Sequence, residues 1–286
     1  MQPLPIYSGS HKTKSPQYAN QTLINWYVMQ SQGAALSDAI IYGVEGISSV
    51  ATAGDFRFVG RGAWVKNEIP YFVQGTNLIR LNSDETITVL GTIAGSKRVS
   101  MASNETQLMI VNESGTGYIW DDSTLTTISS PNFTANGTPT GVCHMDGYFI
   151  CPTDEKKFIK SAIEDGLTWA AIDHSRADGD PDGIQAMIPY KGILYPIGVN
   201  TIEAFNNAGG SDFPFVKVGG LLVGKGMSYR HAYVVTGNAF YFVGSGYGES
   251  PAIYMSNGQE ADKISTDAED YTIRQELQKA GIEDTF

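Results

Sequence analysis

A short apolar phrase centred on isoleucine recurs five times along the chain of 286 residues. The steps between successive isoleucines are 40, 40, 43 and 51 residues, and a second apolar phrase runs just ahead of each one. A period of about 40 residues with several short strands per unit is typical of a β-propeller blade. The sequence therefore predicts an all-β propeller of about five four-stranded blades. The isoleucines are Ile79, Ile119, Ile159, Ile202 and Ile253.

The repeats divide the chain into three parts. Residues 1–55 do not fit the repeat and are predicted to form an N-terminal arm with one strand. The blades are predicted over residues 56–265, with units starting near residues 56, 97, 141, 183 and 226. Residues 266–286 are predicted to be helical, because Thr266 and Glu269 form a capping box.

The five repeats do not by themselves decide whether the ring of blades closes. A single blade cannot bury both faces of its sheet, so each blade must stack on its neighbours. Five units without a closing sheet would leave unpaired strand edges. We expect either a ring that closes with five blades or a chain truncated from a longer polypeptide.

Charge and composition exclude several classes of protein. The net charge is −11, and the 19 Lys and Arg residues are spread thinly along the chain. Binding to a nucleic-acid backbone requires clustered cations, so no sequence-specific nucleic-acid binding is expected.

The N-terminus has no secretion signal, and no apolar run is long enough to span a bilayer. A protein made in a cytoplasm, without membrane insertion by this chain, is expected.

The two cysteines flank a predicted hairpin turn at Asp146 and Gly147. That turn places Met145 opposite Tyr148 and sets Cys143 and Cys151 on opposite faces of the sheet. A disulfide would be poorly placed, so two free thiols are expected.

One motif resembles a turn found in enzymes. Residues 164–169, from Glu164 to Trp169, resemble the Asp-box of sialidase-type propellers, in which the tryptophan packs between sheets. The favoured interpretation is a structural turn. A carbohydrate-binding or glycoside-processing, sialidase-like propeller is the alternative function, and it would need arginines that converge on a carboxylate. A protein-interaction propeller from a host cell is a third hypothesis.

The sequence carries only weak signals for metal or cofactor sites. Asp178, Asp180 and Asp182 have the spacing of calcium ligands, but the twelfth position of the loop is Pro189 rather than glutamate. An acidic turn is favoured over a calcium site. Histidine and cysteine spacings do not suggest zinc, and no catalytic residue or cofactor is predicted.

The segment from residue 208 to residue 225 is the best interface candidate. Its apolar residues lie among glycines, outside the expected strands, where they either dock a partner or fold back onto the propeller. The candidates are Phe213, Phe215, Leu221, Leu222 and Val223.

Several motifs in order carry a family resemblance. They are residues 95–102 (Gly-Ser-Lys-Arg-Val-Ser-Met-Ala), 181–184 (Pro-Asp-Gly-Ile), 200–205 (Asn-Thr-Ile-Glu-Ala-Phe) and 224–226 (Gly-Lys-Gly). Together they resemble the packaged-DNA stabilisation protein, or tail hub, of short-tailed phages of enteric bacteria. The resemblance runs from the N-terminal arm to the C-terminal helix. Family members extend past the position that matches Phe286, which favours a fragment or a shortened relative.

The resemblance implies a structural, non-enzymatic protein of the virion tail, made in the host bacterial cytoplasm. It implies a homo-hexamer below the portal adaptor protein that extends the tail tube. It further implies contacts with the tail needle and the tailspikes, and a role in retaining packaged DNA until ejection.

Overall fold

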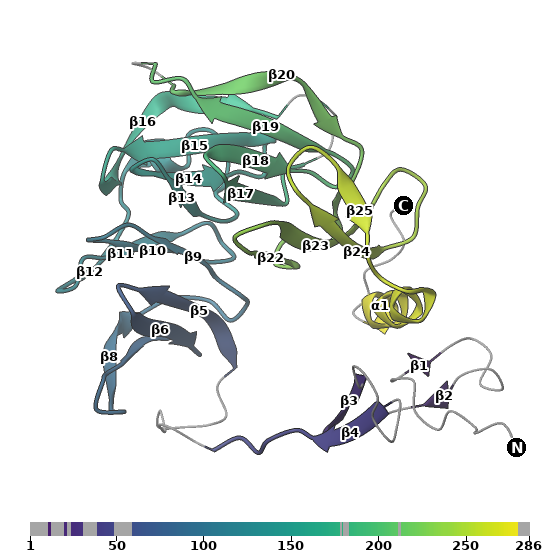
Figure 1. Ribbon diagram of the computed structural model, residues 1–286. Coiled ribbons are helices and arrows are strands. Elements are labelled where there is room, and N and C mark those ends of the chain that lie inside the picture. The colour runs from purple at the N-terminus through teal and green to yellow at the C-terminus, as the bar shows by residue number, and fades with distance from the viewer. Residues whose placement is uncertain are drawn as a thin grey trace, which may run out of the picture.

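The computed structural model describes residues 11–12, 20–21, 24–30, 39–48, 59–177, 179, 183–210 and 213–279. Within these residues the chain is an all-β, five-bladed propeller with one C-terminal helix, as the repeat predicted (Figure 1). Each sheet is antiparallel, and its strands follow one another in chain order, so each blade is a meander built from local hairpins.

The strands of the first four blades have the following bounds. Blade 1 consists of β5 (Gly60–Lys66), β6 (Ile69–Gln74), β7 (Asn77–Leu81) and β8 (Ile87–Thr92). Blade 2 consists of β9 (Ser100–Ser103), β10 (Leu108–Val111), β11 (Gly117–Trp120) and β12 (Leu125–Thr127). Blade 3 consists of β13 (Cys143–Met145), β14 (Tyr148–Pro152), β15 (Lys157–Ala162) and β16 (Asp165–Arg176). Blade 4 consists of β17 (Ala186–Tyr190), β18 (Ile193–Ile197), β19 (Ile202–Asn207) and β20 (Phe215–Val223).

Blade 5 differs from the predicted pattern because its sheet has five strands. They are β21 (Gly226–Met227), β22 (Tyr233–Val235), β23 (Phe240–Ser245), β24 (Ala252–Ser256) and β25 (Ala261–Lys263). Both β21 and β22 pair with β23, at its two ends. The innermost strand of this blade is therefore interrupted between Met227 and Tyr233.

Four apolar cores lie between successive blades, and β10 shows how one strand supplies two of them. Leu108 and Ile110 belong to the core between blades 1 and 2, whereas Met109 and Val111 belong to the core between blades 2 and 3. Successive side chains of a strand point to opposite faces, so a strand with both faces covered is apolar at every position. Two further cores join blade 3 to blade 4 and blade 4 to blade 5.

The hairpin turns have the conformation that their residues predict. Asp146 and Gly147 have φ values of 52° and 82°, and both lie in the left-handed region that a two-residue hairpin loop requires. The register expected from this turn is confirmed, with Cys143 opposite Ile150 and Met145 opposite Tyr148. Cys143 packs toward blade 4 and Cys151 toward blade 2, and both thiols are free. Burial raises the pKa of both thiols.

The arc of blades is open between blade 5 and blade 1. Among the described residues, no buried apolar cluster joins these two sheets. Apolar side chains of blade 1 stay exposed, as Val65 and Val89 illustrate, with 62% and 61% exposure. In Figure 1, helix α1 and the hairpin of β3 (Trp26–Gln30) and β4 (Ala39–Gly43) are drawn on this open side.

Helix α1 (Asp267–Lys279) begins at the predicted capping box and lies against β24 and against β1 (His11–Lys12), which pairs with β2 (Asn20–Gln21). The Thr266 backbone N–H donates to Glu269 Oε2 over 2.7 Å, and the Glu269 N–H donates to Thr266 Oγ1 over 3.4 Å. In the described part of the chain, no helix is both long and apolar enough to cross a membrane. A short 3-10 helix, Pro131–Phe133, lies between blades 2 and 3.

Candidate interaction site at the propeller axis

The innermost strands of all five blades surround a cavity of about 520 Å³. Blades 1 to 5 contribute residues from or next to β5, β9, β13, β17 and β22. Most of this lining is apolar or neutral, and it includes Trp64, Met101, Met187 and Tyr233. Because every blade supplies a wall, this axial cavity exists only when the sheets are arranged radially.

A second, more polar cavity of about 310 Å³ adjoins the axial cavity and shares Arg98, Ser100 and His231 with it. We call this second cavity the axial mouth. Its charged and ring-bearing lining residues are Lys97, Arg98, Glu113, Tyr229, Arg230 and His231.

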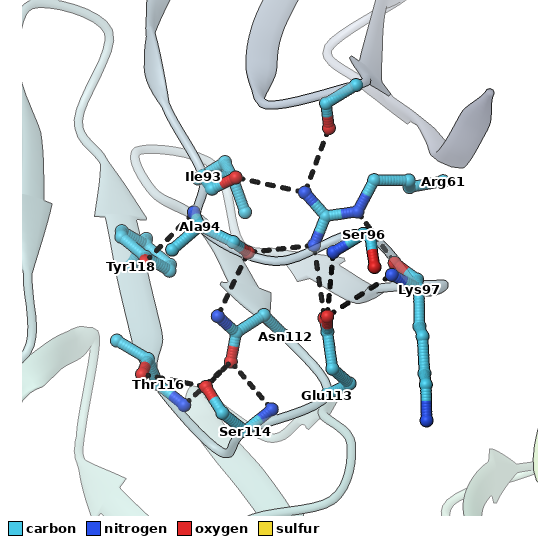
Figure 2. Close-up of polar contacts among 11 residues, drawn as sticks. Arg61, Ile93, Ala94, Ser96, Lys97, Asn112, Glu113, Ser114, Thr116 and Tyr118 are labelled. Carbon is cyan, nitrogen blue, oxygen red and sulfur yellow. Dashed lines mark hydrogen bonds and ion pairs between the residues drawn. The ribbon is translucent and has the colours of Figure 1, made fainter. Parts of the chain in front are cut away.

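Arg61 anchors the loop that carries Lys97 and Arg98 (Figure 2). Its side chain is buried at 2% exposure, and its N–H groups donate at 2.6 to 3.1 Å to four backbone carbonyls and to Glu113. The guanidinium has five N–H donors in a rigid plane, and these contacts engage them all. A buried charge is tolerated when it is paired and fully hydrogen-bonded, so Arg61 can hold blade 1 to the start of blade 2. The carbonyls belong to Gly75, Ile93, Ala94 and Lys97.

Glu113 completes the anchor from blade 2. Its carboxylate accepts from the backbone N–H groups of Ser96 and Lys97 over 2.7 and 3.2 Å, and from Arg61 over 3.1 Å. Burial favours the neutral acid, but these backbone donors and the Arg61 guanidinium outweigh it and lower the pKa of Glu113 to about 2. Glu113 is thus an anion that is neutralised within the protein.

The same loop depends on a glycine and on an asparagine. Gly95 has a φ of 94°, and a Cβ atom there would lie 2.3 Å from Glu113 Oε1. Asn112 Nδ2 donates to the Ala94 carbonyl over 3.1 Å, while its Oδ1 accepts from the Ser114 and Thr116 N–H groups (Figure 2). The loop before β9 is therefore held on both sides, which fixes where Lys97 and Arg98 emerge.

Arg98, Arg230 and His231 all line the axial mouth. Burial lowers the pKa of His231, and the positive charges of Arg98 and Arg230 lower it further. Burial also lowers the pKa of Arg230, although Tyr229 and Asp154 oppose this effect. All three side chains line the same cavity, Arg98 from blade 2 and Arg230 and His231 from blade 5.

His144 lies deeper, in the wall of the axial cavity. Its Nε2 atom is buried without a hydrogen-bond partner, and its ring packs against Phe149 with the centroids 5.3 Å apart. Burial lowers the pKa of His144, although Glu164 and Asp146 act against this effect. The side chain is thus a packed ring of blade 3.

The predicted interface residues occupy different environments. Phe215 and Val223 are buried, with 3% and 7% exposure, and Phe213 packs against the core between blades 3 and 4. Leu221 is half-buried, whereas Leu222 on the outermost strand β20 is 53% exposed. Leu222 is therefore the predicted interface residue that is most available to a partner.

The weak calcium candidates Asp178, Asp180 and Asp182 lie outside the described residues. Within the part of the chain that the structure describes, no group of three or more His, Cys, Asp or Glu side chains is arranged to hold a metal ion.

The Asp-box-like segment forms a packed turn. Trp169 is 4% exposed, its Nε1 donates to the Gly166 carbonyl over 2.8 Å, and its ring lies 4.8 Å from that of Phe133. Two arginines, rather than three, meet at the axial mouth among the described residues. The tryptophan of this motif is thus part of the interblade packing.

No sequence motif singled out the axial mouth. Its residues come from segments about 130 positions apart, at Lys97 and Arg98 and at Arg230 and His231. A usable signal was nevertheless present, because residues just ahead of each innermost strand must gather at one end of the axis. Aligning the repeats by that strand would have placed Arg98 and His231 together.

Comparison with known proteins identifies the family. The family model described as "Bacteriophage P22 Gp10, beta-propeller" matches residues 2–285. This chain belongs to the Gp10 family of phage tail hub proteins. The membership confirms the resemblance carried by the ordered motifs, and it places the chain in a structural rather than an enzymatic family.

One curated relative is the tail hub protein gp10 of Salmonella phage P22, which is 25% identical over 196 residues. The match covers 65% of this Gp10-family chain and 42% of the relative, so the matched region spans less than half the length of that protein.

Two solved structures share the fold at low identity. The BamB protein of Moraxella catarrhalis matches 74% of this chain and 62% of its own, with a TM-score of 0.50 and 13% identity. A chain of the mitotic checkpoint complex matches 79% of this chain and 73% of its own, with a TM-score of 0.51 and 12% identity. At these identities the likenesses support the propeller architecture alone.

Proposed function

We propose that this chain is the propeller part of a phage tail hub that extends the tail tube below the portal adaptor and retains packaged DNA. The observation that carries the proposal is the match of the Gp10 family model over residues 2–285. The curated relative that matches part of the chain is itself named a tail hub protein.

The physical properties of the chain suit this role. Four apolar cores between stacked sheets make a rigid body, because packed interiors deform little. The net charge of −11 disfavours adhesion to a DNA backbone, so DNA can pass a hub surface without being held on it. The proposed mechanism is therefore mechanical closure rather than direct DNA binding.

The proposed partners are those that the family resemblance implied. They are further copies in a homo-hexamer, the portal adaptor, the tail needle and the tailspikes. Within this role we assign Leu222 as a contact residue, because it is an apolar side chain left exposed on the outermost strand of blade 4.

The test is negative-stain imaging of the purified chain mixed with the portal–adaptor complex of its phage. We expect new density beneath the adaptor, and retention of DNA in tailless particles that are supplied with the chain. DNase sensitivity of the packaged genome measures the retention. A folded chain that adds no density would overturn the proposed function.

A matched pair of variants tests the contact residue. Leu222→Asp is expected to weaken the added density, because a carboxylate replaces an exposed apolar side chain in the contact. Ile172→Asp makes a comparable change on the outermost strand of blade 3, where Ile172 is 73% exposed, and it should leave binding unchanged. Equal binding by both variants would remove Leu222 from the interface but leave the hub function intact.

A further inference from the structure

The axial mouth is a cationic site in an acidic protein. Lys97, Arg98 and Arg230 line one cavity of about 310 Å³, although acidic residues outnumber basic ones in the chain by 30 to 19. The positive charges of these side chains repel one another, which raises the energy of the empty site. A bound anion relieves this repulsion.

In the described part of the chain, the carboxylates near the mouth form no ion pair with these cations, although the charge of Asp154 acts on Arg230. Glu113 is engaged by Arg61 and by two backbone N–H groups. Asp154 accepts from the Thr138 N–H over 2.7 Å. Among the described residues, neither Arg98 nor Arg230 forms an ion pair with a carboxylate. Two guanidinium groups therefore remain available to a ligand.

The donor set suits an oxyanion. A guanidinium presents parallel N–H donors that match the oxygens of a phosphate or a carboxylate. The neutral imidazole of His231 offers one more N–H donor, and it lines the axial mouth together with both arginines. Such donors bind more strongly where the site is partly shielded from water.

We propose that the axial mouth binds an oxyanion, a phosphate or carboxylate group, between Arg98 of blade 2 and Arg230 of blade 5, with His231 as a further donor. Arg61 and Glu113 are positioning residues, since they hold the loop from which Arg98 emerges. The site links the second blade to the last one across the axis, so a bound anion would tie together blades that share no buried core. This site is independent of the hub role.

The test is a titration of the chain with inorganic phosphate and, separately, with acetate, at constant ionic strength set with chloride. Binding is followed by isothermal calorimetry and by the NMR signals of the His231 ring. We expect saturable binding of at least one of the two anions, with a shift of the His231 signals. Saturation by phosphate alone assigns a phosphate site, and saturation by acetate alone assigns a carboxylate site.

Matched variants distinguish a specific anion-binding site from general electrostatic attraction by the surface cations. Arg98→Gln and Arg230→Gln should each weaken binding by about tenfold or more, as expected for the loss of a charge-assisted hydrogen bond. Arg176→Gln removes the same charge from an exposed position on blade 3, away from the mouth, and should change the affinity by less than about twofold. Circular dichroism confirms that each variant is folded.

Two results would overturn the inference. One is the absence of saturable binding for both anions in the folded wild-type chain. The other is an equal loss of affinity in Arg176→Gln, which would indicate a diffuse field rather than a site. Neither result bears on assembly beneath the portal adaptor, so failure of this inference is distinguishable from failure of the proposed hub function.

Discussion

At the scale of single residues, the Arg61–Glu113 pair shows how a buried charge becomes part of the fold. Removing one partner of such a pair leaves an uncompensated buried charge, which costs more than the pair itself contributes. Glu113 is the more instructive partner, because its protonation can be followed with pH.

Glu113 should make the protein sensitive to acid. Its pKa is about 2 in the folded state and 4.5 as an ordinary side chain, so its contribution is fully present above pH 4.5 and is lost as the pH falls toward 2. We expect the unfolding free energy of Glu113→Gln to fall less steeply than that of the wild type over this window. Urea unfolding at a series of pH values measures the slopes.

The control for this prediction is Glu105→Gln, at an exposed position in the hairpin between β9 and β10. It should retain the wild-type slope between pH 4.5 and 2. Identical slopes for the wild type and Glu113→Gln would show that the carboxylate does not stabilise the loop.

At the scale of elements, helix α1 depends on its first turn. The capping box satisfies backbone N–H groups that the helix itself leaves unpaired. The last blade ends at this helix, and Lys263, the last residue of β25, pairs with Asp270 over 2.6 Å. The cap therefore stabilises both the helix and its junction with blade 5.

Thr266→Ala should destabilise the helix by about 1 kcal/mol, because the hydroxyl acceptor of the cap is lost. Hydrogen exchange of the backbone amides in residues 267–279 measures the effect directly. Thr272→Ala makes the same substitution at an exposed position inside the helix, where alanine is a better helix former, and should not increase exchange. Faster exchange in both variants would argue against a specific role for the cap.

At the scale of the whole molecule, stability resides between the blades. Phe158 of blade 3 and Phe205 of blade 4 meet edge to face with their centroids 5.1 Å apart, in the core that joins these sheets. Each blade is a short sheet with two apolar faces, so its separation from a neighbour would expose both surfaces to water.

Phe158→Ala should therefore cost about 3–5 kcal/mol of unfolding free energy, because it leaves a cavity at a fully buried position. Chemical denaturation measures the loss. Leu222→Ala, at an exposed position of the adjoining blade, should cost less than about 0.5 kcal/mol. Similar losses for the two variants would contradict the view that interblade packing dominates stability.

The sequence by itself determined the repeat, the strand order and the turns. Blades are meanders of neighbouring strands, so their period, their apolar strand segments and their Asp-Gly and Lys-Gly turns are all local features. The capping box of α1 and the register around Cys143 are local in the same sense. Local features are readable because their physical causes lie within a few residues.

Only the tertiary structure decided which faces and which ends meet. The repeated isoleucine marks the same strand of each blade but not the same face, since Ile119 packs toward blade 3 whereas Ile159 packs toward blade 2. The axial mouth combines Arg98 with Arg230, which lie far apart in the chain. Which sheet faces contact each other, and which distant side chains come together, depends on how whole sheets twist and stack around an axis. That arrangement is a property of all the blades together.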